Sequence, residues 1–143
     1  MYSAKSGNII AVRLEKGEDV HATLLAACRQ HGLKAGFAVS GIGMLANPEL
    51  GFFVGNGEYD RRQFEGNFEL LNLSGNFSLN EGELMGHIHV MLANEDYSVF
   101  GGHLFSAEVG LTLEVQLTIA DQAHMYRKIE PEIGLPGLYI SQL

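Results

Sequence analysis

The chain has 143 residues, of which 46% are hydrophobic and 18% are charged. This composition supplies enough apolar side chains for a buried core and is unlike that of disordered proteins. Acidic residues outnumber basic residues by 17 to 9, which gives a formal net charge of −8. Because a field of this sign repels the phosphate backbone of nucleic acids, we expect the chain to bind DNA or RNA only with the help of a partner.

The apolar segments and the cysteine content favour a cytoplasmic protein that does not enter a membrane. No run approaches the roughly 18 apolar residues that a membrane span needs, and residues 1–7 lack the apolar stretch of a signal peptide. Cys28 is the single cysteine, so an intrachain disulfide is excluded. The length fits one domain. We expect it to span residues 1–143, with a core over about 8–119 and a C-terminal strand or arm over 120–143.

One segment has the periodicity of an amphipathic helix. Apolar or small side chains recur at the i, i+3, i+4, i+7, i+8 positions, namely at Val20, Thr23, Leu24, Ala27 and Cys28. Glu18 and Asp19 are expected in the first turn, where they favour the helix dipole, and Gly32 is expected to end the helix. The sequence therefore predicts one long amphipathic helix.

The rest of the chain has the alternation and turn residues of short antiparallel strands. Strands are expected over 8–14, 35–40, 50–54, 58–64, 68–73, 77–79, 84–92, 97–100 and 109–119. Asn56-Gly57 predicts a tight hairpin, 74–76 a bend or bulge, and Gly101-Gly102 a tight turn. From Val109 to Ile119 the odd-numbered side chains form an apolar face and the even-numbered ones a polar face. The prolines after residue 130 favour an irregular tail.

Two motifs carry a family resemblance. The run Gly66-Asn67-Phe68-Glu69-Leu70-Leu71-Asn72-Leu73-Ser74-Gly75 resembles the Gly-Arg-Phe-Glu-Ile-Leu-x-Leu-Ser-Gly motif of the plants-and-prokaryotes-conserved (PPC) domain. The run Val99-Phe100-Gly101-Gly102-His103 is similar to a glycine motif of the same family. The resemblance extends from about Asn8 to Ile119. Asn67 replaces the motif arginine, which puts in doubt any contact made by that arginine.

The resemblance implies an α+β fold with a curved, mainly antiparallel β-sheet, and assembly as a homotrimer. It also implies an association with DNA binding and gene regulation. The chain resembles the prokaryotic type of this family, in which the domain stands alone. Plant relatives carry AT-hook segments that bind DNA, whereas this chain has no Arg-Gly-Arg AT-hook.

Three histidines are the candidate site. His87 and His89 project from the same face of a predicted strand, because side chains alternate along a strand. A hairpin return brings His103 towards them. Three neutral imidazoles are suitable ligands for Zn²⁺ or a similar divalent metal and leave a fourth position open. The sequence thus predicts a metal site at His87, His89 and His103, while catalytic residues stay unassigned and no organic cofactor is expected.

Two functions remain open on this basis. The first is a homotrimeric assembly or interaction domain with a three-histidine metal site, which binds copies of itself and either a protein partner or a small ligand. The alternative is a metal-dependent enzyme that acts on a small polar substrate at that site, with Glu114 as a candidate base. The non-enzymatic function is favoured, because no local motif specifies a catalytic constellation.

Overall fold

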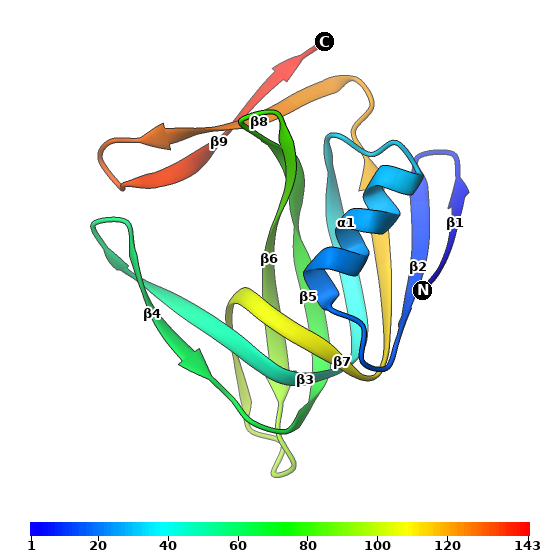
Figure 1. Cartoon of the computed structure of the whole chain (residues 1–143), viewed down its shortest axis with the longest axis vertical. Coiled ribbons are helices and arrows are strands. Elements are labelled where there is room, and N and C mark those ends of the chain that lie inside the picture. Colours follow the sequence, from blue (N-terminus) through cyan, green and yellow to red (C-terminus); the bar gives the residue numbers. More distant parts are fainter.

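The computed structural model describes all 143 residues, as one nine-stranded sheet with a single helix (Figure 1). Its elements in chain order are β1 (Tyr2–Ser6), β2 (Ile9–Glu15), α1 (Val20–Gln30), β3 (Gly36–Gly55), β4 (Glu58–Gln63), β5 (Asn67–Asn80), β6 (Glu83–Ala93), β7 (Val99–Ile119), β8 (Ala123–Glu130) and β9 (Leu135–Gln142).

Four strands close into a ring. β3 pairs with β5, β5 pairs with β6, β6 pairs with the beginning of β7, and β7 pairs with β3, all antiparallel. β7 also pairs with β2, and β2 pairs with β1, so the sheet extends beyond the ring on this side. β3 and β7 each pair with different strands along their length, because each bends at several register shifts. The expected curved, mainly antiparallel sheet is confirmed in this form.

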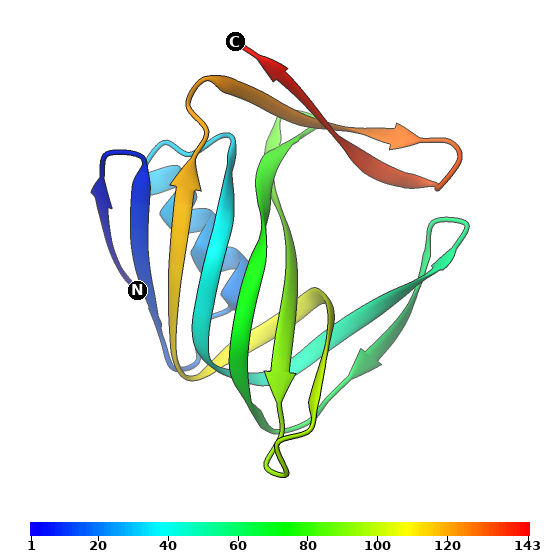
Figure 2. The same ribbon diagram turned by 180° about the vertical axis from the view of Figure 1, so that it is seen from behind.

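The helix covers one face of this extension, and the opposite face has no helix over it (Figure 2). Val20, Leu24, Ala27 and Cys28 are buried against the sheet, as the periodicity predicted. The expectation of a long helix was wrong, because α1 has 11 residues. Asp19 precedes the helix instead of joining its first turn, and its carboxylate accepts a hydrogen bond from the Ala22 amide at 2.7 Å. No helix in the fold combines the length and hydropathy required to traverse a bilayer.

The glycine that predicted a bend at 74–76 lies within a long strand instead. Gly75 is part of β5, where it pairs with Ile88 of β6. A Cβ on Gly75 would clash with the carbonyl oxygen of His87. The glycine at this position therefore permits two strands to approach closely and does not turn the chain.

The same correction applies to the predicted Gly101-Gly102 turn. Both residues are in β7, which runs without a break to Ile119. A Cβ on Gly101 would clash with the carbonyl oxygen of Val90, and one on Gly102 would lie 2.9 Å from that of Gly51. β7 is in contact with β6 on one side and β3 on the other at this point, so there is no room for side chains.

Two further expectations about the second half of the chain were wrong. Leu111 is 63% exposed, although alternation placed it on the buried face with Leu113. A register shift between β3 and β7 breaks the alternation here, because Gly43 is opposite Leu113 whereas Leu45 is opposite Val109. The tail, expected to be irregular, is a hairpin of β8 and β9 that joins β5 through a short parallel pairing.

Candidate metal centre

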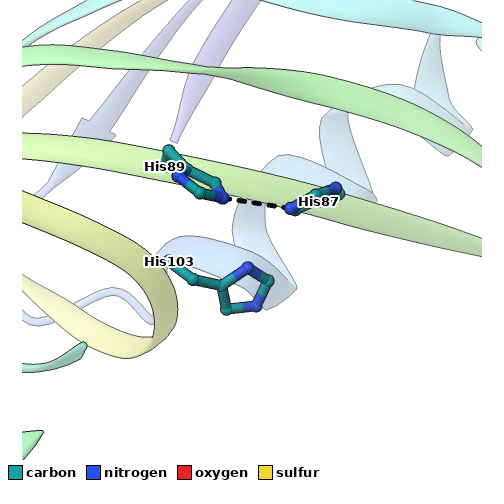
Figure 3. A group of neighbouring side chains, drawn as sticks. All are labelled: His87, His89 and His103. Carbon is teal, nitrogen blue, oxygen red and sulfur yellow. Dashed lines mark hydrogen bonds between the residues drawn. The ribbon is translucent and has the colours of Figure 1, made fainter. Parts of the chain in front are cut away.

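The register of β6 and β7 brings the three histidines together. His89 is paired directly with His103 across the two strands, and His87 lies two residues before His89 on the same face. The prediction that a hairpin return would place His103 beside the pair is therefore confirmed in geometry. Figure 3 shows the rings of all three side chains in one group.

The ring nitrogens are close enough to share one ion. One nitrogen from each of His87, His89 and His103 lies within 4.8 Å of the other two. The Nε2 atoms of His87 and His89 are 3.1 Å apart, and the ring centroids of the three pairs are separated by 5.0 to 5.4 Å. Three imidazole nitrogens at such spacing can turn towards a tetrahedral ion at Zn–N distances of about 2.0–2.1 Å.

Partial loss of solvent favours the neutral form of these imidazoles. Loss of solvent, together with the neighbouring Arg127 and His89, lowers the pKa of His87 from 6.5 to about 4. Loss of solvent, together with His87 and His89, also lowers the pKa of His103 to about 4. The pKa of His89 is lowered by burial as well. Neutral imidazole is the form that ligates a metal ion, so the site is prepared for a cation at neutral pH.

One nitrogen of the group lacks a partner. Nδ1 of His103 is buried and forms no hydrogen bond. A buried polar atom without a partner costs free energy unless something satisfies it. With the ring proton on Nε2, the lone pair of Nδ1 would be satisfied by a bound metal ion.

Arg127 of β8 links the histidines to the C-terminal hairpin. Its Nη2 atom lies 3.3 Å from Nδ1 of His87 and donates to Oδ1 of Asn76 at 2.8 Å. Its Nε and Nη1 atoms donate to Oγ of Ser78 and to the carbonyl oxygen of Pro136, at 3.1 and 2.7 Å. Since a guanidinium only donates, Nδ1 of His87 accepts here, which places the proton of the neutral ring on Nε2.

A cavity of about 410 Å³ opens beside His87 and His103. Its walls come from β4, β5, β6, β7 and the β8–β9 hairpin. The remaining lining residues are Tyr59, Asn76, Met85, Phe105, Arg127, Ile133, Leu135, Pro136, Gly137 and Leu138. The ring of Tyr59 lies 5.1 Å from that of His103 and 5.2 Å from that of Phe105. The volume is in the range of small-molecule sites.

The other candidate residues lie elsewhere. His21 contacts the carbonyl oxygen of Leu104, and His31 contacts the hydroxyl of Ser3, each at 2.9 Å. Glu114 pairs with Arg13 across β7 and β2 and lines a different cavity on the helix-free face. Burial raises the pKa of the Cys28 thiol to about 12, which makes it unreactive.

Sequence reasoning missed the residues that surround the histidines, above all Arg127. It lies in the tail that was expected to be irregular because of Pro131 and Pro136. The available signal was alternation: Met125 and Arg127 are both buried and two residues apart on β8. Tyr59 had no local signal, since only the β3–β4 hairpin brings it to the cavity.

Comparison with known proteins supports the fold and the resemblance. A crystal structure of a protein provisionally named as DNA-binding, from Bacteroides thetaiotaomicron, is 28% identical, covers 96% of both chains and superposes with a TM-score of 0.89. A plant- and prokaryote-conserved (PPC) protein from Pyrococcus horikoshii is 32% identical over 92% of both chains, with a TM-score of 0.81.

Two other relatives have names that do not refer to DNA binding. A protein from Archaeoglobus fulgidus described as metal-containing is 29% identical, covers 94% of this chain and 95% of its own, and has a TM-score of 0.83. The bifunctional protein GlmU of a Synechococcus strain is 29% identical over 133 residues, which are 92% of this chain but 20% of that protein. The chain thus spans about a fifth of the length of this curated relative.

The sequence profile of one family matches most of the chain. It is that of the Plants and Prokaryotes Conserved (PCC) domain, and it matches residues 1–121. Both motifs noted in the sequence lie within this range, on β5 and at the beginning of β7. The chain belongs to the Plants and Prokaryotes Conserved domain family.

Proposed function

We propose that this protein is a homotrimeric PPC assembly domain in which His87, His89 and His103 bind a divalent metal ion such as Zn²⁺. The observation that carries the metal site is the direct pairing of His89 with His103, with His87 on the same face. Three ring nitrogens lie within 4.8 Å of one another, and one of them is buried without a partner. The metal-containing relative from Archaeoglobus fulgidus supports the proposal by analogy.

Binding of the metal requires a change at His87. If Nε2 is the ligand atom, the ring proton has to move to Nδ1, which now accepts from Arg127. The two N–H groups would then face each other, so the contact of Nη2 of Arg127 with Nδ1 has to give way to an acceptor. An oxygen acceptor behind a metal-bound imidazole is the usual arrangement.

The self-assembly is supported by apolar side chains on the helix-free face. Exposed residues of β3 and β7 gather there, namely Phe37, Val39, Ile42 and Leu111, at 40% to 63% exposure. A hollow of about 550 Å³ lies on the same side, over β1, β2, β7 and β3. Apolar area of this kind on a small domain marks an interface, and copies of the same chain are its occupants in this proposal.

Zinc uptake tests the metal site directly. Protein stripped with a chelator, incubated with one to three equivalents of Zn²⁺ and desalted should retain roughly one ion per subunit by elemental analysis. Retention of no stoichiometric ion would remove the metal from the proposal and leave the assembly domain.

An enzymatic function is the second candidate, and the cavity beside the histidines is the observation in its favour. Hydrolytic metal sites pair the ion with an acid or base near the bound water. No Asp or Glu lines this cavity, so a carboxylate base is not at hand. Ligand binding therefore agrees with the geometry better than catalysis does.

A further inference from the structure

The β8–β9 hairpin contributes a buried cation to the cavity that has no acidic partner. Arg127 is 9% exposed, and its four contacts are all with neutral groups: a hydroxyl, an amide oxygen, a carbonyl oxygen and an imidazole. The ion pairs in the structure join Met1 to Glu15 and Glu18, and Arg61 to Glu49. Removing a charge from water without a counter-ion is costly, so the position of Arg127 calls for an anion.

The hydrogen-bond count leaves room for that anion. A guanidinium has five N–H donors, and four of those on Arg127 are engaged. One N–H on Nη1 is left, and the contact between Nη2 and His87 is the longest of the four, at 3.3 Å. A carboxylate takes two parallel N–H groups from a guanidinium, and the Nη1 and Nη2 edge of Arg127 can offer them.

The rest of the cavity wall is mostly apolar and therefore favours a ligand with an apolar chain. Six of its lining side chains are hydrophobic, and they belong to β4, β6, β7 and the hairpin with its turn: Tyr59, Met85, Phe105, Ile133, Leu135 and Leu138. Gly51 of β3 permits this lining, because a Cβ there would clash with the ring of Phe105. Since no acidic side chain lines the cavity, no carboxylate of the chain competes for Arg127 there.

We infer that this cavity binds a small carboxylate with an apolar chain, and that Arg127 holds the carboxylate. The inference rests on the proposed function for the location of the site, since His87 and His103 form one wall, whereas the anion contact rests on Arg127 alone. A carboxylate-bearing molecule at this place would supply the counter-charge that the chain itself does not. The apolar chain would lie against the hairpin and Phe105.

The test compares two probes of equal length, hexanoate and its neutral analogue hexanamide. Isothermal titration of each into zinc-loaded and into chelator-treated protein should show saturable binding of hexanoate, at least about tenfold tighter than that of hexanamide. Arg127→Gln should abolish this preference. Equal affinities for the two probes, or no saturable binding of hexanoate by the folded protein, would overturn the inference.

A pair of Leu138 variants provides a second test in case loss of Arg127 unfolds the hairpin. Leu138 is paired with Arg127 across β8 and β9, so the two side chains share a face. Leu138→Glu would place a carboxylate beside the guanidinium and should weaken hexanoate binding at least about tenfold by competition. Leu138→Gln, of the same shape without the charge, should bind hexanoate much more tightly than the Glu variant. Equal binding by the two variants would contradict the role of Arg127.

The zinc content of each sample, measured separately, distinguishes this inference from the proposed function. Protein that holds zinc but does not prefer hexanoate overturns the carboxylate site and leaves the metal site intact. Protein that takes up no zinc but prefers hexanoate through Arg127 supports the carboxylate site and removes the metal.

Discussion

At the scale of single residues, the histidine cluster is defined by what surrounds it. The three imidazoles have each other, Arg127 and aromatic rings as neighbours, and no carboxylate lines the cavity beside them. Burial, together with the neighbouring imidazoles and Arg127, lowers the pKa of the two cavity-lining histidines, His87 and His103, to about 4. Both the metal affinity of the site and its response to acid follow from this environment.

Removal of one imidazole should disable the metal site without unfolding the protein. His89 is exposed, so His89→Ala should leave the thermal unfolding temperature within a few degrees of the wild type. Zinc affinity, measured by competition with a coloured chelator, should fall on the order of 100-fold or more, since even groups behind the ligands contribute 10- to 100-fold. His124→Ala is the matched control, because His124 is an exposed histidine on β8 outside the cluster. Equal loss in both variants would contradict the assignment.

The lowered pKa values predict how the metal-free protein responds to acid. The unfolded chain binds protons at its histidines below about pH 6.5, whereas folded His87 and His103 do so only near pH 4. The unfolded state therefore holds more protons between these values, and the free energy of unfolding should fall as the pH falls from 6.5 to 4. Urea midpoints at half-unit steps measure this. His103→Asn should flatten the slope, and an unchanged slope would show that burial does not affect this group as described.

The lowered pKa values of His87 and His103 also lower the pH at which the metal ion should dissociate. An ordinary histidine would lose zinc as the pH falls through about 6.5. Because burial delays protonation of His87 and His103, zinc should remain bound at pH 5.5 and dissociate nearer their pKa of about 4. The chelator competition described above, repeated along a pH series, gives the midpoint.

At the scale of the elements, the glycines of β7 decide where His103 lies. Gly101→Ala would introduce a Cβ against the carbonyl oxygen of Val90, so β6 and β7 would have to separate. We expect a loss of about 1–3 kcal/mol in the free energy of unfolding, typical of overpacking, together with weaker zinc binding. Val99→Ala is the control, since Val99 is on the same strand and 55% exposed. Retention of full stability and zinc affinity by the glycine variant would contradict this account.

Periodicity predicted the elements that are short and regular. The alternation of β2 was correct, with Ile10, Val12 and Leu14 buried, and so was the hairpin at Asn56-Gly57, where both residues have positive φ. The His87–His89 face followed from alternation alone. Each of these depends on local spacing, which a single sequence displays.

The long strands were beyond prediction because their glycines are explained by residues distant in the chain. Gly75 is opposite Ile88, and Gly102 is against Gly51; a sequence shows the glycine but not the backbone that approaches it. Arg127 was missed for a related reason, since Ser78 and Asn76 reach it only through the pairing of β5 with β8.

At the scale of the whole molecule, the helix-free face predicts self-assembly. Exposed apolar side chains such as Ile42 and Leu111 would be removed from water by neighbouring copies. Sedimentation equilibrium at micromolar concentration should give about three times the chain mass of 15.6 kDa. Ile42→Asp should shift the mass towards that of one chain, while Tyr97→Asp, in the exposed turn between β6 and β7, should not. A monomeric wild type would contradict the trimer.

The net charge predicts weak binding to nucleic acid by the isolated protein. With 17 acidic and 9 basic residues, there is little release of counter-ions to drive association with a phosphate backbone. Titration of a mixed-sequence duplex at physiological salt should give no submicromolar affinity. Tight binding that weakens steeply with added salt would reveal a local basic surface despite the overall charge.

Closure of β3, β5, β6 and β7 into a ring also has a consequence for how the chain reaches this state. The β6–β7 hairpin that carries the histidines joins segments that are near in sequence, whereas the ring closes only when β3 meets β7, for example at Gly36 and Ile119. The entropy of that long loop is lost before most contacts form, so folding should be slow compared with that of helical domains of this size. Before the ring closes, strands that have partners on both sides in the native state still have unpaired edges. Association of partly folded chains during refolding should begin at these edges.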